Sequence, residues 1–180
     1  MFLETERLIL RDFTAGDVDD LHEIFGDEET MNNTEPPYSK DKTQAFLMSF
    51  CVNRTSKGAY AAVLKSTGKV IGYVLFKPVG EPEVYEIGWI FNKAHWRKGY
   101  AYEVCSRLVR HGFGDMKLHK IFAEAIDYVK SVSLMKKLGM ELEGVQRKQT
   151  RSNDGVWRDL FLYAILAEDY FAALRAEPLR

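Results

Sequence analysis

The stretch Trp96-Arg97-Lys98-Gly99-Tyr100-Ala101 decides the fold, because it joins an apolar strand to an amphipathic helix through a glycine. A strand is predicted before it over Val84–Phe91. The helix after it has apolar positions at i, i+3 and i+4 spacing: Ala101, Val104, Cys105, Leu108 and Gly112. Free N–H groups and the positive dipole end of a helix attract anions, and Gly99 leaves room for a phosphate. The stretch therefore predicts either an anion site or a simple turn.

The pattern on both sides of this stretch predicts a single α/β domain over residues 1–180. The expected strands are Leu8–Phe13, Tyr60–Leu64, Val70–Phe76, Val84–Phe91, Ile121–Ile126, Leu142–Gln146 and Val156–Leu166. Helices are expected after an N-cap at Thr14 with Asp17 as its partner, after Ser39 or Asp41, from Ala101, over Ser131–Leu138 and over Ala167–Arg175. Residues 26–39 read as a loop. This order gives a mixed, mostly antiparallel sheet of about seven strands with helices on its faces.

Composition excludes several classes of protein. The 180 residues carry 25 Lys and Arg against 26 Asp and Glu, so no basic surface for nucleic acid or an anionic membrane is expected. The longest apolar stretches, such as Val70–Phe76, are far below the roughly 20 residues that span a bilayer. The N-terminal residues lack a secretion signal, which favours the cytoplasm. Two cysteines and four scattered histidines show no metal-ligand spacing, so no metal site is expected.

The order of the motifs resembles the GCN5-related N-acetyltransferase (GNAT) superfamily. Within it, the chain is similar to the branch of ribosomal-protein N-terminal acetyltransferases (RimJ/RimL-like) and their spermidine-acetylating relatives. The motifs that carry the resemblance are Glu4–Arg11, Tyr85–Ile90, Trp96–Ala101, Ser131 with Lys137–Met140, Glu143–Val145 and Trp157–Asp159. They cover nearly the whole chain in the family's order.

The resemblance implies acetyl-CoA as the acetyl donor and assigns residues to its binding. The backbone amides that would hold the coenzyme A pyrophosphate are those of Arg97, Lys98, Gly99, Tyr100 and Ala101. The fourth strand is expected to splay from the fifth, so that pantetheine pairs with its edge at Gly88, Trp89 and Ile90. Trp96 stands where the superfamily often has Gln or Arg.

Three residues are candidates for catalysis. Glu86 lies inside the fourth strand and is the candidate base for the amine proton, unless it only faces solvent. Ser131 and Tyr128 occupy the positions of the family's Asn-x-x-Ser, with tyrosine in place of asparagine. Either could hydrogen-bond to pantetheine or protonate the leaving thiolate. Ser131 could instead be the N-cap of its helix.

The expected function is transfer of acetyl from acetyl-CoA to a primary amine, first of all a protein N-terminal α-amine. Acetylation of a polyamine or another small amine is the alternative. A coenzyme A binding module without turnover is the rival from another class, and Tyr128 in place of asparagine is its only hint. The acceptor site is expected between residues 26–39 and 146–156. No nucleic acid or membrane partner is expected, and a homodimer is left open.

Overall fold

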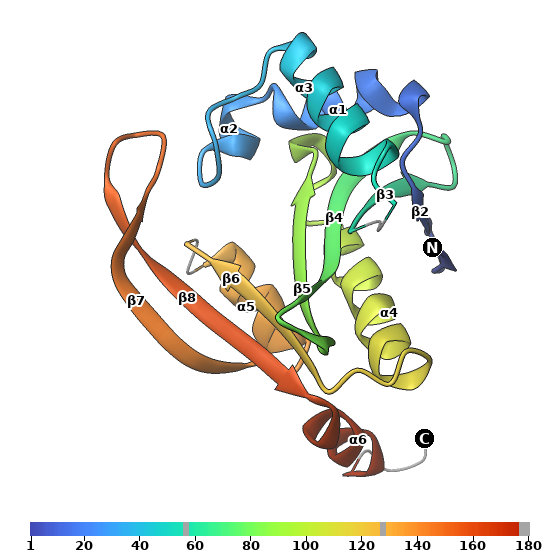
Figure 1. Cartoon of the computed structure of the whole chain (residues 1–180), viewed down its shortest axis with the longest axis vertical. Coiled ribbons are helices and arrows are strands. Elements are labelled where there is room, and N and C mark those ends of the chain that lie inside the picture. Colours follow the sequence, from blue (N-terminus) through green and yellow to red (C-terminus); the bar gives the residue numbers. More distant parts are fainter. Residues whose placement is uncertain (56–57, 127–128, 177–180) are drawn as a thin grey trace.

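The computed structural model describes residues 1–55, 58–126 and 129–176. Within them, eight strands form one sheet in the order β1-β2-β3-β4-β5-β6-β8-β7 (Figure 1). The strands are β1 Phe2–Glu4, β2 Leu8–Asp12, β3 Ala59–Leu64, β4 Val70–Val79, β5 Glu81–Phe91, β6 Lys120–Ala125, β7 Glu141–Arg151 and β8 Trp157–Leu166. The α-helices are α1 Val18–Phe25, α2 Glu28–Met31, α3 Lys40–Phe46, α4 Tyr100–Gly114, α5 Lys130–Lys137 and α6 Ala167–Ala176. A π-helical segment, η2 Leu47–Val52, continues α3, and short 3-10 turns, η1 Ala15–Asp17 and η3 Lys93–His95, precede α1 and α4.

The predicted fold class is confirmed. Neighbouring strands pair antiparallel except β5 and β6, which are parallel. The structure has one strand more than expected. This strand is β1, which precedes the first expected strand, β2, in the sequence and pairs with it. The predicted capping box also forms, since the Thr14 N–H donates to an Asp17 carboxylate oxygen at 2.7 Å. Ser39 proves to be the cap of α3 and accepts the Lys42 N–H.

Two segments predicted as loops are regular. Residues 26–39 contain α2, whose N-cap Asp27 accepts the Thr30 N–H at 2.8 Å. β7 extends to Arg151, although a loop was predicted from Gln146. The β7–β8 register shifts between Gln146 and Thr150, where Lys148 has a φ of 52°. This bulge, and the exposure of most of β7, remove the alternation that would have identified the strand.

The two faces of the sheet bury separate apolar clusters. α4 and α5 cover one face, where Leu108, Phe113 and Met135 are at most 1 % exposed. α1, α3 and η2 cover the other face with a second cluster that includes Ile24 and Leu47, both 0 % exposed. Burying each such side chain contributes about 1.5–3 kcal/mol. Both faces of the central strands are therefore fixed by packing. No helix in the described ranges is long and apolar enough to cross a bilayer.

The sheet is split between β5 and β6, where the splay was expected. These strands pair only through Val84 with Lys120, Tyr85 with Ile121 and Glu86 with Phe122. Beyond Glu86, β5 continues to Phe91 along β4, while β6 continues along β8. Within the part of the chain that the structure describes, the edge of β5 that faces β6 thus has no strand partner over residues 87–91.

Candidate active site

The N-terminus of α4 lies directly after β5 and has the backbone of an anion site. Gly99 is the N-cap, with a φ of 83°, and Arg97 has a φ of 59°. Two left-handed residues this close turn successive N–H groups toward one side, which forms a concave anion-binding nest. α4 has 15 residues, and no side chain among the described residues caps it. Of the two predicted alternatives, the anion site therefore has the better support.

Trp96 fixes this loop to the end of β5. Its indole N–H donates to the Phe91 carbonyl oxygen at 2.6 Å. The Lys130 ammonium, from the start of α5, lies 4.3 Å from the centre of the Trp96 ring. This cation–π contact holds the positive charge of Lys130 beside the loop. Tryptophan at position 96 therefore has a structural role in place of the usual Gln or Arg.

Arg7 is hydrogen-bonded to the same loop, a contact that no pattern in the sequence predicted. It directly precedes β2, and its Nη1 donates to the Lys98 carbonyl oxygen at 2.9 Å. Its Nε donates to the Glu103 carboxylate at 2.7 Å, and its guanidinium carbon lies 4.4 Å from the centre of the Tyr100 ring. Burial would raise the pKa of Glu103, but hydrogen bonds from Thr5 and Arg7 outweigh burial and lower it. The ion pair is therefore fully charged at neutral pH.

The unpaired edge of β5 presents backbone groups to the split. The Asn92 N–H donates to the Ile71 carbonyl on β4 at 2.9 Å, whereas the Phe91 carbonyl points the other way, toward Trp96. Backbone groups alternate sides along a strand. Gly88 and Ile90 therefore hydrogen-bond toward β4, and Trp89 directs its N–H and carbonyl into the split.

Glu86 lies where the β5–β6 pairing ends. Its side chain is 23 % exposed and its carboxylate is 3.1 Å from the Lys77 ammonium on β4, so it does not simply face solvent. The parallel register places Phe122 beside it, and Glu124 follows on the same face of β6. Burial and the nearby Glu86 carboxylate raise the pKa of Glu124, whereas the Lys77 ammonium partly offsets this by lowering it. Three charged groups thus gather at the split.

Glu124 was missed from the sequence, although a signal was present. It is an exposed carboxylate in a short strand whose alternate residues, Ile121, Ala123 and Ala125, are buried. The alternation alone places it on the face opposite α4.

Ser131 is the second residue of α5 and is half-buried. The N-cap of this helix is Val129, so of the two roles left open for Ser131, capping the helix is the one that the structure contradicts. The chain enters α5 through a residue that is already helical, which moves the helix start ahead of the serine. Tyr128 lies outside the described residues.

A cavity of about 760 Å³ lies between α2, η3 and the start of α5. Its lining residues are Gly26, Asp27, Glu28, Glu29, Asn32, Asn33, Lys93 and Lys130. Asp27 and Lys93, two of these lining residues, form an ion pair at 2.6 Å in the cavity wall. Most of the lining comes from residues 26–39, one of the two segments predicted to bound the acceptor.

Other titratable residues form no second centre in the described ranges. No three His, Cys, Asp or Glu side chains gather there in a group that could hold a metal ion. Cys51 and Cys105 are both buried, as predicted for apolar filling residues. Burial raises the pKa of the Cys105 thiol far above its usual range.

The fold and the site together define a class of protein. A mixed sheet is split between two parallel strands, and the strand with the unpaired edge leads into a helix whose N-terminus has a nest of backbone N–H groups. The family model described as an acetyltransferase (GNAT) domain matches residues 7–141. The chain belongs to the GNAT acetyltransferase family and is an acetyltransferase enzyme.

Individual relatives agree with this assignment. YnaD of Bacillus subtilis (strain 168), an uncharacterized N-acetyltransferase, is 31% identical over 172 residues, which are 94% of this chain and 99% of the relative. A GNAT-family acetyltransferase from Bacillus anthracis has a crystal structure with a TM-score of 0.84 and 31% identity, covering 93% of this chain and 99% of its own. The spermidine N-acetyltransferase from Vibrio cholerae, in complex with CoA and spermine, shares the fold at 23% identity and a TM-score of 0.79, covering 92% of this chain and 98% of its own.

Proposed function

We propose that this enzyme transfers the acetyl group of acetyl-CoA to a primary amine, with residues 1–180 acting as one N-acetyltransferase domain. The observation that carries the proposal is the position of Glu86 where the β5–β6 pairing ends, with the unpaired β5 edge leading from it toward the loop at Trp96–Ala101. Acetyl-CoA supplies an activated thioester and a pyrophosphate. The nest at Arg97–Gly99 and the open first turn of α4 fit the pyrophosphate.

The proposed binding roles follow the split. Backbone N–H groups of the stretch Arg97–Ala101, which includes Lys98, Gly99 and Tyr100, hold the pyrophosphate. The β5 edge at residues 88–90 takes pantetheine in place of a strand, as an added strand does in peptide recognition. Because backbone groups alternate sides along the strand, the Trp89 N–H points into the split. It is therefore the proposed donor to the thioester carbonyl oxygen.

The proposed chemistry is direct attack by the amine. Glu86 accepts a proton from the ammonium through water, and the free amine then forms the C–N bond as the C–S bond breaks. The thiolate leaves and takes a proton from Ser131, Tyr128 or solvent. Glu124 is a second carboxylate close enough to attract the cationic acceptor to the same place.

A protein N-terminal α-amine is the proposed acceptor, in line with the resemblance to the ribosomal-protein branch. The cavity wall supports it, because Lys93 and Lys130 stand among the acidic residues. A chain end carries one ammonium followed by neutral carbonyl groups, which suits a wall of mixed charge. A polycation would be repelled by both of these lysines.

A polyamine is the second candidate. Asp27, Glu28 and Glu29 line the same cavity, and Glu86 and Glu124 lie at the split. Five carboxylates would attract a molecule with several ammonium groups. The acceptor of the Vibrio cholerae enzyme belongs to this class.

Thiol release from acetyl-CoA across an amine panel tests the proposal. The panel holds peptides with free N-termini, the same peptides with blocked N-termini, and spermidine. Turnover with the free peptides alone supports the N-terminal amine, and faster turnover with spermidine supports the polyamine. Tight coenzyme A binding with no turnover on any amine would identify a binding module instead. The compartment and the homodimer stay predictions from the sequence.

A further inference from the structure

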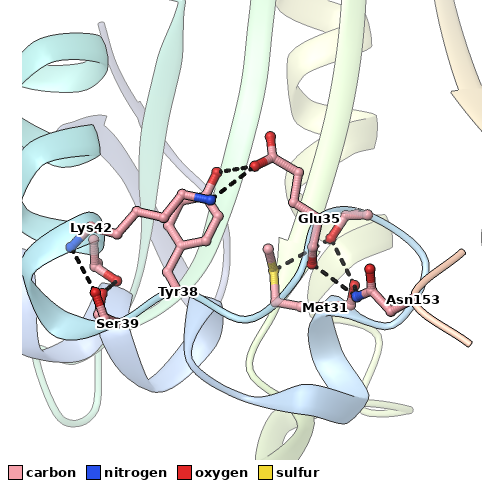
Figure 2. A network of polar contacts seen from close by, with 8 residues as sticks. Met31, Glu35, Tyr38, Ser39, Lys42 and Asn153 are labelled. Carbon is pink, nitrogen blue, oxygen red and sulfur yellow. Dashed lines mark hydrogen bonds and ion pairs between the residues drawn. The ribbon is translucent and has the colours of Figure 1, made fainter.

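The tip of the β7–β8 hairpin is hydrogen-bonded to the segment between α2 and α3 through one residue, Asn153. Its side-chain Nδ2 donates to the carbonyl oxygens of Met31 and Glu35, each at 3.0 Å. Its backbone N–H donates to the Asn32 carbonyl oxygen at 3.2 Å. Figure 2 shows the side chain reaching from the hairpin into the curve of residues 31–35. Two parts of the chain far apart in sequence are thereby joined.

The segment is also held from its other side. The Glu35 carboxylate accepts hydrogen bonds from the Tyr38 hydroxyl at 2.8 Å and from the Lys42 ammonium at 3.3 Å (Figure 2). Met31 is 2 % exposed and packs into the cluster under α1 and α3. Residues 31–35 therefore have a fixed position as long as both sides remain bound.

The hairpin tip is ordered enough to present Asn153. Ser152 is 4 % exposed, and its hydroxyl donates to Asp154 at 2.6 Å. Asp154 in turn pairs with Arg158 at 2.6 Å. Because these bonds lie within the tip, removing the Asn153 amide leaves the turn intact and removes only its attachment.

We propose that Asn153 determines recognition of the amine acceptor by fixing the wall of the acceptor cavity. Asn32 and Asn33 line that cavity, and the carbonyls that Asn153 binds belong to Asn32 and to residues on either side of this pair. None of its recorded partners belongs to the α4 loop or to the split. This role rests on the proposed function. It concerns recognition of the amine acceptor and not of acetyl-CoA.

The chemistry of the contact explains why asparagine is needed. A primary amide has two N–H donors on one nitrogen and can serve two carbonyl oxygens at once. Aspartate has the same shape but only acceptor oxygens when ionised, so it would be repelled by both carbonyls. Asn153→Asp should therefore displace the tip more than Asn153→Ala, which only deletes the two bonds.

Steady-state kinetics of these two variants test the proposal, with Glu141→Gln, an exposed position at the start of β7 and outside residues 146–156, as the hairpin control. Loss of two hydrogen bonds should raise KM for the amine about tenfold in Asn153→Ala, and further in Asn153→Asp. KM for acetyl-CoA and the affinity for coenzyme A should stay within about twofold, because no phosphate contact changes. The control should match the original protein in both. Equal changes in the two KM values, or no change in the amine KM, would overturn the proposal.

Hydrogen exchange separates this inference from the proposed function. If the original protein turns over no amine, the proposed function fails. The attachment is then judged by amide exchange at residues 31–35. Faster exchange in Asn153→Asp than in Glu141→Gln supports the attachment of residues 31–35 through Asn153, and equal exchange refutes it.

Discussion

Replacing Arg7 by methionine should weaken coenzyme A binding from the far side of the loop. The change keeps an apolar stem of similar length and removes the guanidinium. The bonds lost are those to the Lys98 carbonyl oxygen at 2.9 Å and to the Glu103 carboxylate at 2.7 and 2.6 Å. The contact with the Tyr100 ring at 4.4 Å is lost as well. The backbone N–H of residue 7 still donates to Glu103 at 2.7 Å.

The size of the effect follows from the exposure of these groups. Breaking a fully buried ion pair costs about 3–5 kcal/mol and an exposed one about 0–1 kcal/mol. Here the side chains of Arg7 and Glu103 are 41% and 16% exposed, which places their pair between these limits. With the carbonyl bond and the ring contact, we expect the free energy of unfolding to fall by about 2–3 kcal/mol. Coenzyme A affinity should fall about 10- to 30-fold, because the loop no longer starts in the binding conformation.

Arg11→Met is the matched control. Arg11 lies at the other end of β2 and donates two hydrogen bonds to the Asp17 carboxylate, each at 2.8 Å. The side chains of Arg11 and Asp17 are 29% and 9% exposed, and their ion pair is not part of the contacts described for the loop at residues 96–101. Urea unfolding should show similar losses of stability in both variants, whereas calorimetry should show weaker coenzyme A binding for Arg7→Met alone. Equal coenzyme A affinity in the two variants would refute the reasoning.

Five further substitutions test the rest of the site. Gly99→Asp should weaken coenzyme A binding by about 100-fold or more in calorimetry, because it brings a negative charge to the pyrophosphate and a side chain to a φ of 83°. Glu86→Gln should lower turnover by roughly 100- to 10,000-fold with little change in coenzyme A affinity, and a rate within about twofold would make Glu86 structural. Ser131→Ala should slow thiol release without loss of thermal stability, since Val129 is the cap; if Tyr128→Phe is slow and Ser131→Ala is normal, the tyrosine carries the role. Glu103→Gln should be less stable than the original protein above about pH 4.3, the ordinary glutamate pKa, and the difference should vanish as pH falls through the lowered pKa of folded Glu103.

The parts of the fold that local rules encode were predictable from the sequence. The strands β2 to β6 and β8 alternate or run apolar, and Thr14 and Ser39 cap the helices they precede. The glycine at position 99, between a strand and an amphipathic helix, marks the start of α4, where the sequence predicts either an anion site or a turn. β7 was cut short because most of its residues are exposed, so its extent depends on pairing with β8.

The contacts that hold the site in place could not be predicted. Arg7 and Glu103 are separated by 96 positions, and Asn153 and Met31 by 122. No periodicity links residues at such distances, and each of these side chains looks like an ordinary polar residue in its own segment. Their roles become visible only when the sheet order brings β2 beside the α4 loop and the β7–β8 hairpin beside α2.

The inner edge of β5 also bears on how this protein avoids aggregation. An unpaired strand edge at the rim of a sheet can recruit a strand from another chain. Here the open edge lies inside the sheet and is faced by β6. A foreign strand brings side chains on two faces and needs about 4.8 Å of spacing on each side. Because the opening is flanked by strands of the same sheet, this edge is shielded from the strand addition that seeds a fibril at an outer rim.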